Sequence, residues 1–311
     1  MWKRPLVNNH AALDLALQHE VKHSALPLDD VVTVVCASAL ASARSPCCRP
    51  RPFAFTNGVA YRCPMDSPTA PHPVLKKYYE SESERRPFVR TLFDDAAEHY
   101  DWVCALGSFG AGQHYRRSVL VKSGLCAGMR LLDVATGTGL VARAATRILR
   151  DPEAVIGLDP SGGMLREARR TLSIPLVQGT VEELPFANNH FDFLSMGYAL
   201  RHMADLGVAF GECLRVLKPG GRVLILEITQ PSSRLGQRVF RVYFEKVLPR
   251  IARISTGSAK AELLMKYYWD TIAGCVPPDM ILGVLKSSGF IDVERRVLGG
   301  LLSEYLGRKP V

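Results

Sequence analysis

The sequence lacks a long hydrophobic run, since no apolar stretch reaches the ~20 residues that a helix needs to span a bilayer. It also lacks paired cysteines. Of its eight cysteines only Cys47 and Cys48 are neighbours, and neither a C-x-x-C pair nor a His/Cys ligand spacing occurs. These absences argue against a spanning helix, a disulfide framework and a metal site. They indicate free thiols in a reducing compartment.

What is present is the composition of a globular protein. Hydrophobic residues make up 47% and charged residues 22% of the chain. A length of 311 residues is enough for one or two domains with a sizeable core. The net charge of +9 suits nucleic acid, an acidic partner or an anionic membrane surface, and does not choose among them.

Residues 1–88 differ from the rest of the chain. They hold four of the eight cysteines and repeated prolines, without sustained periodicity. An apolar run at 31–43 resembles a signal-peptide core, but it lies far from the start and follows Asp29 and Asp30. We predict a poorly ordered extension and linker over 1–88 and a domain over 89–311. Import into an organelle through the extension stays open, as does a functional start at Met65.

The central motif is LLDVATGTGLVA at 131–142. A short buried-strand pattern ends in an acid, a turn of small residues follows, and a helical pattern continues to Ile148. Gly137 and Gly139 lack a Cβ, so the backbone can bend sharply and a ligand can lie against it. Strand, glycine turn and helix are typical of one half of a nucleotide-binding βαβ unit. An ordinary strand-to-helix turn has the same local pattern.

A carboxylate follows at the end of the next strand pattern. Asp159 closes AVIGLD, 20 residues after Gly139, where a nucleotide-binding fold places an acceptor for the ribose hydroxyls. The run Gly137 to Ala142 also satisfies G-x-G-x-x-A. A nicotinamide- or flavin-dependent oxidoreductase is therefore the first competitor.

From residue 89 onwards, helix and strand patterns alternate. This alternation predicts an α/β domain with a mostly parallel sheet that helices cover on both faces. The expected helices are 89–106, 113–123, 140–150, 161–172, 206–217, 234–254 and 280–288. The expected strands end or lie at 131–133, 154–159, 175–179, 191–197 and 223–228, followed by a hairpin at 290–297 and 301–306.

Three later features favour a methyltransferase over the dinucleotide enzymes. They are the loop Leu184-Pro185-Phe186, the turn KPGGR at 218–222 and the terminal hairpin. In this order they resemble the class I S-adenosylmethionine-dependent methyltransferases. That resemblance implies a Rossmann-like fold with a seven-stranded, mostly parallel sheet and a terminal antiparallel hairpin.

The resemblance narrows to one family. LLDVATGTG, VIGLDPSGGML, ELPFANNHFD, ALRH and LRVLKPGGRVLILEITQP are similar to the ubiquinone/menaquinone biosynthesis C-methyltransferases, over about 89–310. Membership implies methyl transfer from S-adenosylmethionine to a ring carbon of a prenylated quinol. An N- or O-methyltransferase of another lipid or small metabolite, and an NAD(P)-dependent oxidoreductase, are the alternatives.

The resemblance also implies a cofactor site. Its residues are Asp133, Ala135, Gly137, Thr138, Gly139, Asp159, Met164, Thr180, Val181 and Gly197. In the family the glycine turn holds the methionine end, the acid binds the ribose, and the residue at Gly197 flanks the sulfonium. Two positions depart from the family pattern, because Thr180 replaces an acid or amide and Gly197 replaces a common serine.

The expected catalytic residues are Arg201, His202 and Tyr100. A phenol with a pKa near ~10 needs a base or a nearby positive charge to ionise at neutral pH. Arg201 would stabilise the phenolate, unless it only forms a salt bridge with a surface acid. His202 stands where the family has Asn and would relay the proton with an apparent pKa near ~6.5. Glu227 would orient substrate or water.

The segment 234–254 is basic and amphipathic. It packs against its own domain, or it contacts anionic lipid at a membrane surface. We predict a cytoplasmic protein that is peripheral to the membrane if this segment binds lipid. Its partner would be a prenylated quinol or another small molecule, with no nucleic acid and no metal, and the oligomeric state is not predicted.

Overall fold

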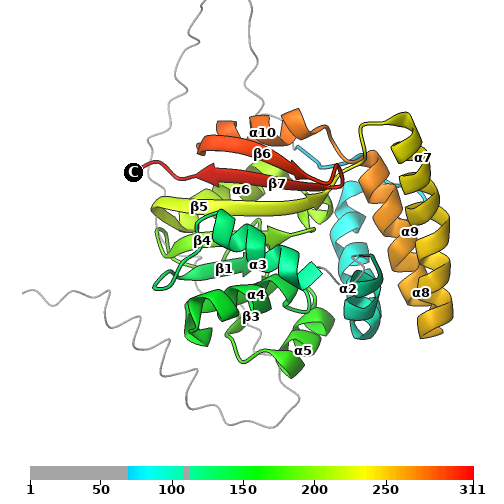
Figure 1. The fold of residues 1–311 in the computed structure, drawn as a ribbon, viewed down its shortest axis with the longest axis horizontal. Coiled ribbons are helices and arrows are strands. Elements are labelled where there is room, and N and C mark those ends of the chain that lie inside the picture. Colours follow the sequence, from blue (N-terminus) through cyan, green and yellow to red (C-terminus); the bar gives the residue numbers. More distant parts are fainter. Residues whose placement is uncertain (1–68, 108–111) are drawn as a thin grey trace, which may run out of the picture. The chain divides into compact units, whose positions relative to one another are not determined.

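A seven-stranded sheet lies at the centre of the computed structural model, which describes residues 69–107 and 112–311 (Figure 1). The strand order is β3-β2-β1-β4-β5-β7-β6. Neighbours from β3 to β5 pair in parallel, whereas β7 is antiparallel to both β5 and β6. The strands are β1 (Leu131–Val134), β2 (Val155–Asp159), β3 (Leu176–Gln178), β4 (Phe191–Gly197), β5 (Leu217–Ile228), β6 (Ile291–Leu298) and β7 (Leu302–Arg308). The predicted class I methyltransferase topology is confirmed.

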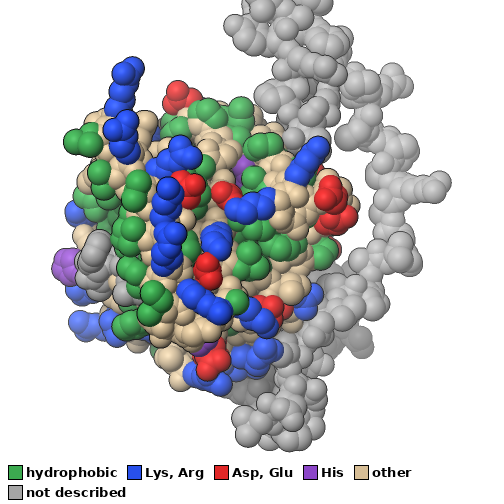
Figure 2. Space-filling view, turned by 90° about the vertical axis from the view of Figure 1, so that its right-hand side faces the viewer, with side chains coloured by type: hydrophobic (Ala, Val, Ile, Leu, Met, Phe, Trp, Pro, Cys, Tyr) green, Lys and Arg blue, Asp and Glu red, His purple; other side chains and the backbone are tan. Residues whose placement is uncertain are grey.

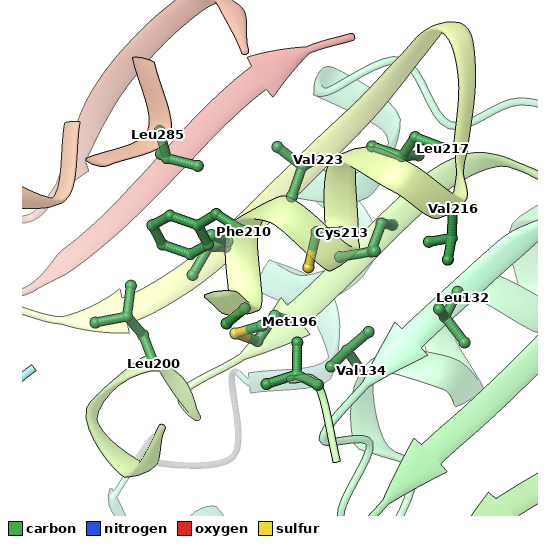
Figure 3. Packing of buried hydrophobic residues seen from close by; sticks show 14 of the residues in the cluster. Leu132, Val134, Met196, Leu200, Phe210, Cys213, Val216, Leu217, Val223 and Leu285 are labelled. Atoms are coloured by element: carbon green, nitrogen blue, oxygen red, sulfur yellow. The ribbon is translucent and has the colours of Figure 1, made fainter. Parts of the chain in front are cut away.

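Helices cover both faces of the sheet because its central strands are apolar on both sides. On one face α6 (Leu206–Val216) and α10 (Pro278–Ser287) pack through Phe210, Cys213 and Leu285 onto the strands (Figure 3). On the other face α3 (Gly112–Lys122) and α4 (Leu140–Leu149) pack onto alternate strand residues. α5 (Gly162–Thr171) follows β2.

A third apolar cluster is built by helices beyond the carboxyl end of β5 (Figure 1). These helices are α2 (Glu82–Gly107), α7 (Arg234–Val242), α8 (Leu248–Thr256) and α9 (Ala259–Gly274). α7 continues into α8 through one π-helical turn, Tyr243–Val247. The predicted single helix over 234–254 is therefore two α-helices joined by this turn.

One helix and the starts of two other elements differ most from the expectation. α9 was not predicted. β5 begins at Leu217, because the KPGG residues join the strand with Gly220 at φ 77°. α2 begins at Glu82, and Tyr79 and Arg85 before position 89 are 4% and 0% exposed. The linker interpretation is thus wrong for 69–88, while the extension expected over 1–68 lies outside the described residues.

The segment 69–81, which we call the N-terminal strap, joins several distant elements. The Thr69 carbonyl accepts from Leu206 N at 3.0 Å, and the Pro71 carbonyl accepts from Val276 N at 2.8 Å. Tyr78 donates from its hydroxyl to Asp270 of α9. The strap therefore ties the starts of α6 and α10 to α9.

In 69–107 and 112–311, no helix is long and apolar enough to cross a membrane.

Candidate active site at the carboxyl edge of the sheet

Asp133, in β1, stabilises the turn that follows this strand. This carboxylate is 1% exposed and accepts from Thr136 Oγ1 at 2.7 Å, Ser195 Oγ at 2.6 Å and Ala142 N at 3.1 Å. Burial raises its pKa to about 6. Asp133 is almost fully buried and accepts three hydrogen bonds from the protein, so this residue supports the turn instead of facing a ligand. Ala135, at φ 51°, bends the chain directly above it.

Asp159 ends β2 beside the same turn. Its two oxygens accept from Gly137 N and from Ser161 N, each at 2.8 Å. Burial raises the pKa of Asp159 to about 6, against these two hydrogen bonds, which lower it. The structure thus brings together Asp159 and Gly137, which were expected to share one site.

The glycine turn has room for a ligand on one side only. A Cβ on Gly137, at φ 58°, would meet nothing nearer than Tyr100 Cε1 at 4.0 Å. A Cβ on Gly139, at φ 83°, would lie 2.2 Å from Leu172 Cδ1. Open space over Gly137 next to the Asp159 carboxylate fits a nucleoside-bearing cofactor, whereas Gly139 is required for helix packing.

The other expected cofactor residues line the neighbouring strand ends. Met164 is 1% exposed at the start of α5, and Val181 is buried next to Thr180, which forms a bridge with Glu183. A Cβ on Gly197 would lie 2.8 Å from Val141 Cγ2. A serine, as is common in the family, would not fit at Gly197 without a shift.

A contact that the sequence did not indicate places α2 over this region. Asp94 accepts from Ser161 Oγ at 2.6 Å and from Gly163 N at 2.7 Å, at the start of α5. Asp101, further along α2, accepts a hydrogen bond from Thr138 Oγ1. These contacts hold Tyr100 above the glycine turn.

Arg201 and Glu227 form a buried ion pair at the ends of β4 and β5. Their side chains are 0% and 2% exposed, and Arg201 Nη1 contacts Glu227 Oε1. The guanidinium also lies 4.8 Å from the ring centroid of Tyr268 and donates from Nε to Thr271 Oγ1 at 3.3 Å. Arg201 is thus paired with an acid of the interior, not with the surface acid of the alternative interpretation. Burial raises the pKa of Glu227, although Arg201 lowers it.

His202 lies in an aromatic cluster. Its ring centroid is 5.1 Å from that of Phe93, 5.5 Å from Tyr267 and 5.8 Å from Tyr268. Both ring nitrogens are buried and have no hydrogen-bond partner. Burial and the charge of Arg201 hold the pKa of His202 well below its usual value. The expected proton relay with a pKa near ~6.5 is therefore wrong, because this imidazole is a weak base.

Tyr100 lies between the glycine turn and the aromatic residues around Arg201. Its hydroxyl lies 3.2 Å from that of Tyr268, and burial raises its pKa. Tyr267, Tyr268 and Thr271 come from α9, and sequence reasoning missed all three. Their spacing within one helical turn and a half was the available signal.

The described residues contain no group of three or more His, Cys, Asp or Glu that is arranged to hold a metal ion.

Comparisons with known proteins agree with this arrangement. The sequence model of the ubiE/COQ5 methyltransferase family matches residues 79–309. The ubiquinone/menaquinone biosynthesis C-methyltransferase UbiE of Syntrophotalea carbinolica is 36% identical over 240 residues, which cover 75% of this chain and 97% of that protein. The enzyme of the same name from Geobacter sulfurreducens is 33% identical, over 73% of this chain and 90% of that protein.

Solved structures share the fold at low identity. An S-adenosylmethionine-dependent methyltransferase from Thermotoga maritima superposes with a TM-score of 0.51 and 20% identity, covering 71% of this chain and 99% of that one. Phosphoethanolamine N-methyltransferase 2 of Haemonchus contortus, in complex with S-adenosyl-L-methionine, superposes with a TM-score of 0.52 and 18% identity. The match covers 76% of this chain and 61% of that one. The family match spans most of the described chain, and the chain belongs to the ubiE/COQ5 methyltransferase family.

Proposed function

We propose that this protein transfers a methyl group from S-adenosylmethionine to a ring carbon of a prenylated quinol. The proposal rests above all on the buried Arg201–Glu227 pair, which lies among aromatic side chains at the carboxyl edge of the sheet. The two UbiE relatives, which are C-methyltransferases of ubiquinone/menaquinone biosynthesis, support the same reaction.

The cofactor half of the site positions the methyl donor. When bound, S-adenosylmethionine supplies a methyl carbon that its sulfonium already activates. Asp159 would accept hydrogen bonds from the ribose, and the open side of Gly137 would admit the methionine end. Met164, Thr180 and Val181 would surround the adenine. Correct placement of the two reactants supplies much of the rate in such a transfer.

The acceptor half stabilises a negative charge on the ring oxygen. An electron-rich ring attacks best as a phenolate, and the Arg201 guanidinium is a permanent positive charge in a buried site. Tyr100, Tyr268 and Phe93 lie next to one another here, and a quinol ring would pack against them face to face or edge to face. His202 is neutral and lies among aromatic rings, and the flat side of its imidazole would pack against the acceptor ring.

The direct test is methyl transfer in vitro. Purified protein, S-adenosylmethionine with an isotopically labelled methyl group and a prenylated quinol lacking the ring methyl should yield a product labelled on carbon, as mass spectrometry and NMR would show. A label on oxygen or nitrogen would favour the alternative methyltransferases. Binding of NADH instead of S-adenosylhomocysteine in calorimetry would favour the oxidoreductase.

We also propose that the protein contacts an anionic membrane through what we call the basic face, the exposed side of α7–α8. Six basic side chains project from it: Arg234, Arg238, Arg241, Lys246, Arg250 and Arg253. Apolar residues lie between them, among which Leu235, Val239 and Ile254 are 73%, 62% and 83% exposed. Figure 2, which views the molecule from this side, shows basic and hydrophobic side chains interleaved.

The charge of the basic face supports contact with lipid, and not packing of this face against the protein's own domain. Glu245 is its single acid, and it is bonded to Arg241 at 2.9 Å. Cations around an apolar strip match the headgroups and acyl chains of an anionic bilayer. A prenylated acceptor resides in such a bilayer, so this contact would bring the site to its substrate.

A further inference from the structure

A phenol must lose its proton before its ring carbon attacks, and few groups near Arg201 are able to take that proton. His202 is a weak base, as its lowered pKa shows. Burial raises the pKa of Tyr100 and of Tyr268, and that of Cys275 to about 12, so these groups are themselves protonated at neutral pH. Glu227 is the carboxylate in direct contact with Arg201.

The two oxygens of Glu227 are used unequally. Oε1 accepts from Arg201 Nη1 and also from Ile228 N at 2.7 Å. Oε2 is buried and has no partner, and the same is true of Arg201 Nη2. A buried polar atom without a partner is unfavourable, and more so when it is charged. An unused acceptor and an unused donor on one ion pair suit a ligand that first donates and then accepts, which is the behaviour of a hydroxyl group.

We propose that Glu227 is the general base of the reaction and that Arg201 Nη2 holds the oxyanion which this base creates. This inference rests on the proposed function. The acceptor O–H bond breaks and its proton binds Glu227 Oε2. The ring carbon then forms the new bond to the methyl carbon with its own electron pair, while the methyl–sulfur bond breaks and leaves its pair on sulfur. Loss of the proton from that ring carbon to water restores the aromatic ring as the phenolate. The phenolate regains a proton from Glu227, so one proton leaves per turnover.

The proton transfer keeps the buried charge constant. Before it, Arg201 faces the Glu227 carboxylate, and after it Arg201 faces a phenolate while Glu227 is neutral. No additional charge has to be buried, so the large desolvation penalty of an isolated ion is avoided. Burial already favours the protonated form of Glu227, because it raises the pKa. The other titratable groups that interact with this carboxylate are Tyr198, Tyr268, Cys275 and Tyr305.

The test replaces Glu227 by Gln, which keeps the size and the contact to Arg201 but cannot take a proton. We expect kcat to fall by about 100-fold or more, a general-base magnitude, with S-adenosylhomocysteine affinity within twofold of the wild type. In the wild type the rate should fall at low pH as Glu227 becomes protonated. In Glu227→Gln it should instead rise about tenfold per pH unit until the free phenol ionises. Glu227→Asp should recover part of the rate.

The matched control is Glu304→Gln. It changes another buried carboxylate, which lies on β7 opposite Leu226 of β5. It should keep the wild-type pH profile. A Glu227→Gln variant with wild-type kcat and an unchanged acidic limb would overturn the role of Glu227, while the methylation itself would stand.

A second measurement needs no variant and covers the case in which Glu227→Gln fails to fold. Calorimetry on the wild type with S-adenosylhomocysteine compares 2-prenylhydroquinone with its dimethyl ether. At pH 8 the hydroquinone should bind at least tenfold more tightly, because only it donates to Oε2, and the preference should shrink at pH 5. Equal affinities at both pH values would overturn the inference. Absence of methyl transfer to any prenylated quinol would instead count against the proposed function.

Discussion

The two glycines of the central turn differ in what surrounds them. Both have positive φ values, 58° for Gly137 and 83° for Gly139, so any side chain at either position is strained by about 1–2 kcal/mol. Only Gly139 is closely packed, since its Cβ would overlap Leu172. Gly137 instead faces open space beside Tyr100. One glycine therefore serves the fold and the other serves the ligand.

We predict that Gly139→Ala lowers the thermal unfolding midpoint more than Gly137→Ala does, because it adds the displacement of Leu172 to the backbone strain. Gly137→Ala should remain folded yet bind S-adenosylhomocysteine at least tenfold more weakly, since the new methyl group fills the cofactor's space. Thermal unfolding and calorimetry on both variants would decide. Wild-type affinity in Gly137→Ala would show that the cofactor does not approach this residue.

Asp159 should make cofactor affinity depend on pH. Its carboxyl pKa is about 6 because it is buried, and the ribose needs the ionised form as acceptor. Affinity should therefore be constant above pH 7 and fall as protons bind below pH 6, by about tenfold at pH 5. Asp159→Ala should weaken S-adenosylhomocysteine binding by ~2–3 kcal/mol and lose this dependence.

The matched control is Asp151→Ala, which removes an exposed carboxylate before β2. Its affinity should follow the wild type at every pH. If the dependence persists in Asp159→Ala, the titrating group is Asp133, whose pKa is also about 6.

At the scale of elements, the strands were predictable and one helix was not. β2 and β4 lie within a residue of their predicted limits because their buried apolar runs end at turn residues. α9 mixes charged and aromatic residues, and it is buried against α2 and α8, so its apolar pattern is not one-sided. The partner of Arg201 was also beyond prediction, since Glu227 lies 26 residues away and meets it only through the pairing of β4 with β5.

The basic face of α7–α8 should bind anionic vesicles. Each cation near such a surface contributes about 1 kcal/mol. We predict that Arg238→Glu/Arg250→Glu binds vesicles of phosphatidylglycerol and phosphatidylcholine at least tenfold more weakly than the wild type in co-sedimentation. Binding of the wild type should weaken with added salt, and vesicles of phosphatidylcholine alone should bind poorly.

Arg169→Glu/Lys286→Glu supplies the same change of charge on α5 and α10, away from the basic face. It should sediment as the wild type does. Equal losses in the two double variants would mean that net charge alone attracts the vesicles, and the assignment to α7–α8 would fail.

At the scale of the whole molecule, Arg85 connects the N-terminal strap to the acceptor half of the site. Its guanidinium is 0% exposed and donates to the carbonyls of His72 at 2.7 Å and Met203 at 3.2 Å. Met203 directly follows Arg201 and His202. The strap was expected to be a linker, because its charged and proline-containing composition conceals a packing role that depends on residues far along the chain.

We predict opposite outcomes for two truncations. A chain beginning at Met65 retains every contact described for 69–107 and 112–311, so its unfolding midpoint should match that of the full chain. A chain beginning at Val89 lacks Arg85 and the strap. The Met203 carbonyl then loses its donor, and the N–H groups of Leu206 and Val276 lose their acceptors, so this chain should be destabilised by several kcal/mol. Thermal unfolding would compare them. Equal midpoints for the two chains would show that the strap contributes nothing to stability.

The strap also determines when the site is completed during synthesis. The partners of Tyr78 and Lys77 lie on α9, so the bond from Tyr78 to Asp270 spans 192 residues. The cofactor half, by contrast, is formed by residues between Gly137 and Val181, all of which leave the ribosome before α9. A growing chain can therefore assemble a nucleoside pocket early, while the strap waits for the last helices before it can close behind Arg201. Methyl transfer should accordingly begin only after the carboxyl-terminal helices have emerged, because long-range closure is the slowest class of contact to form.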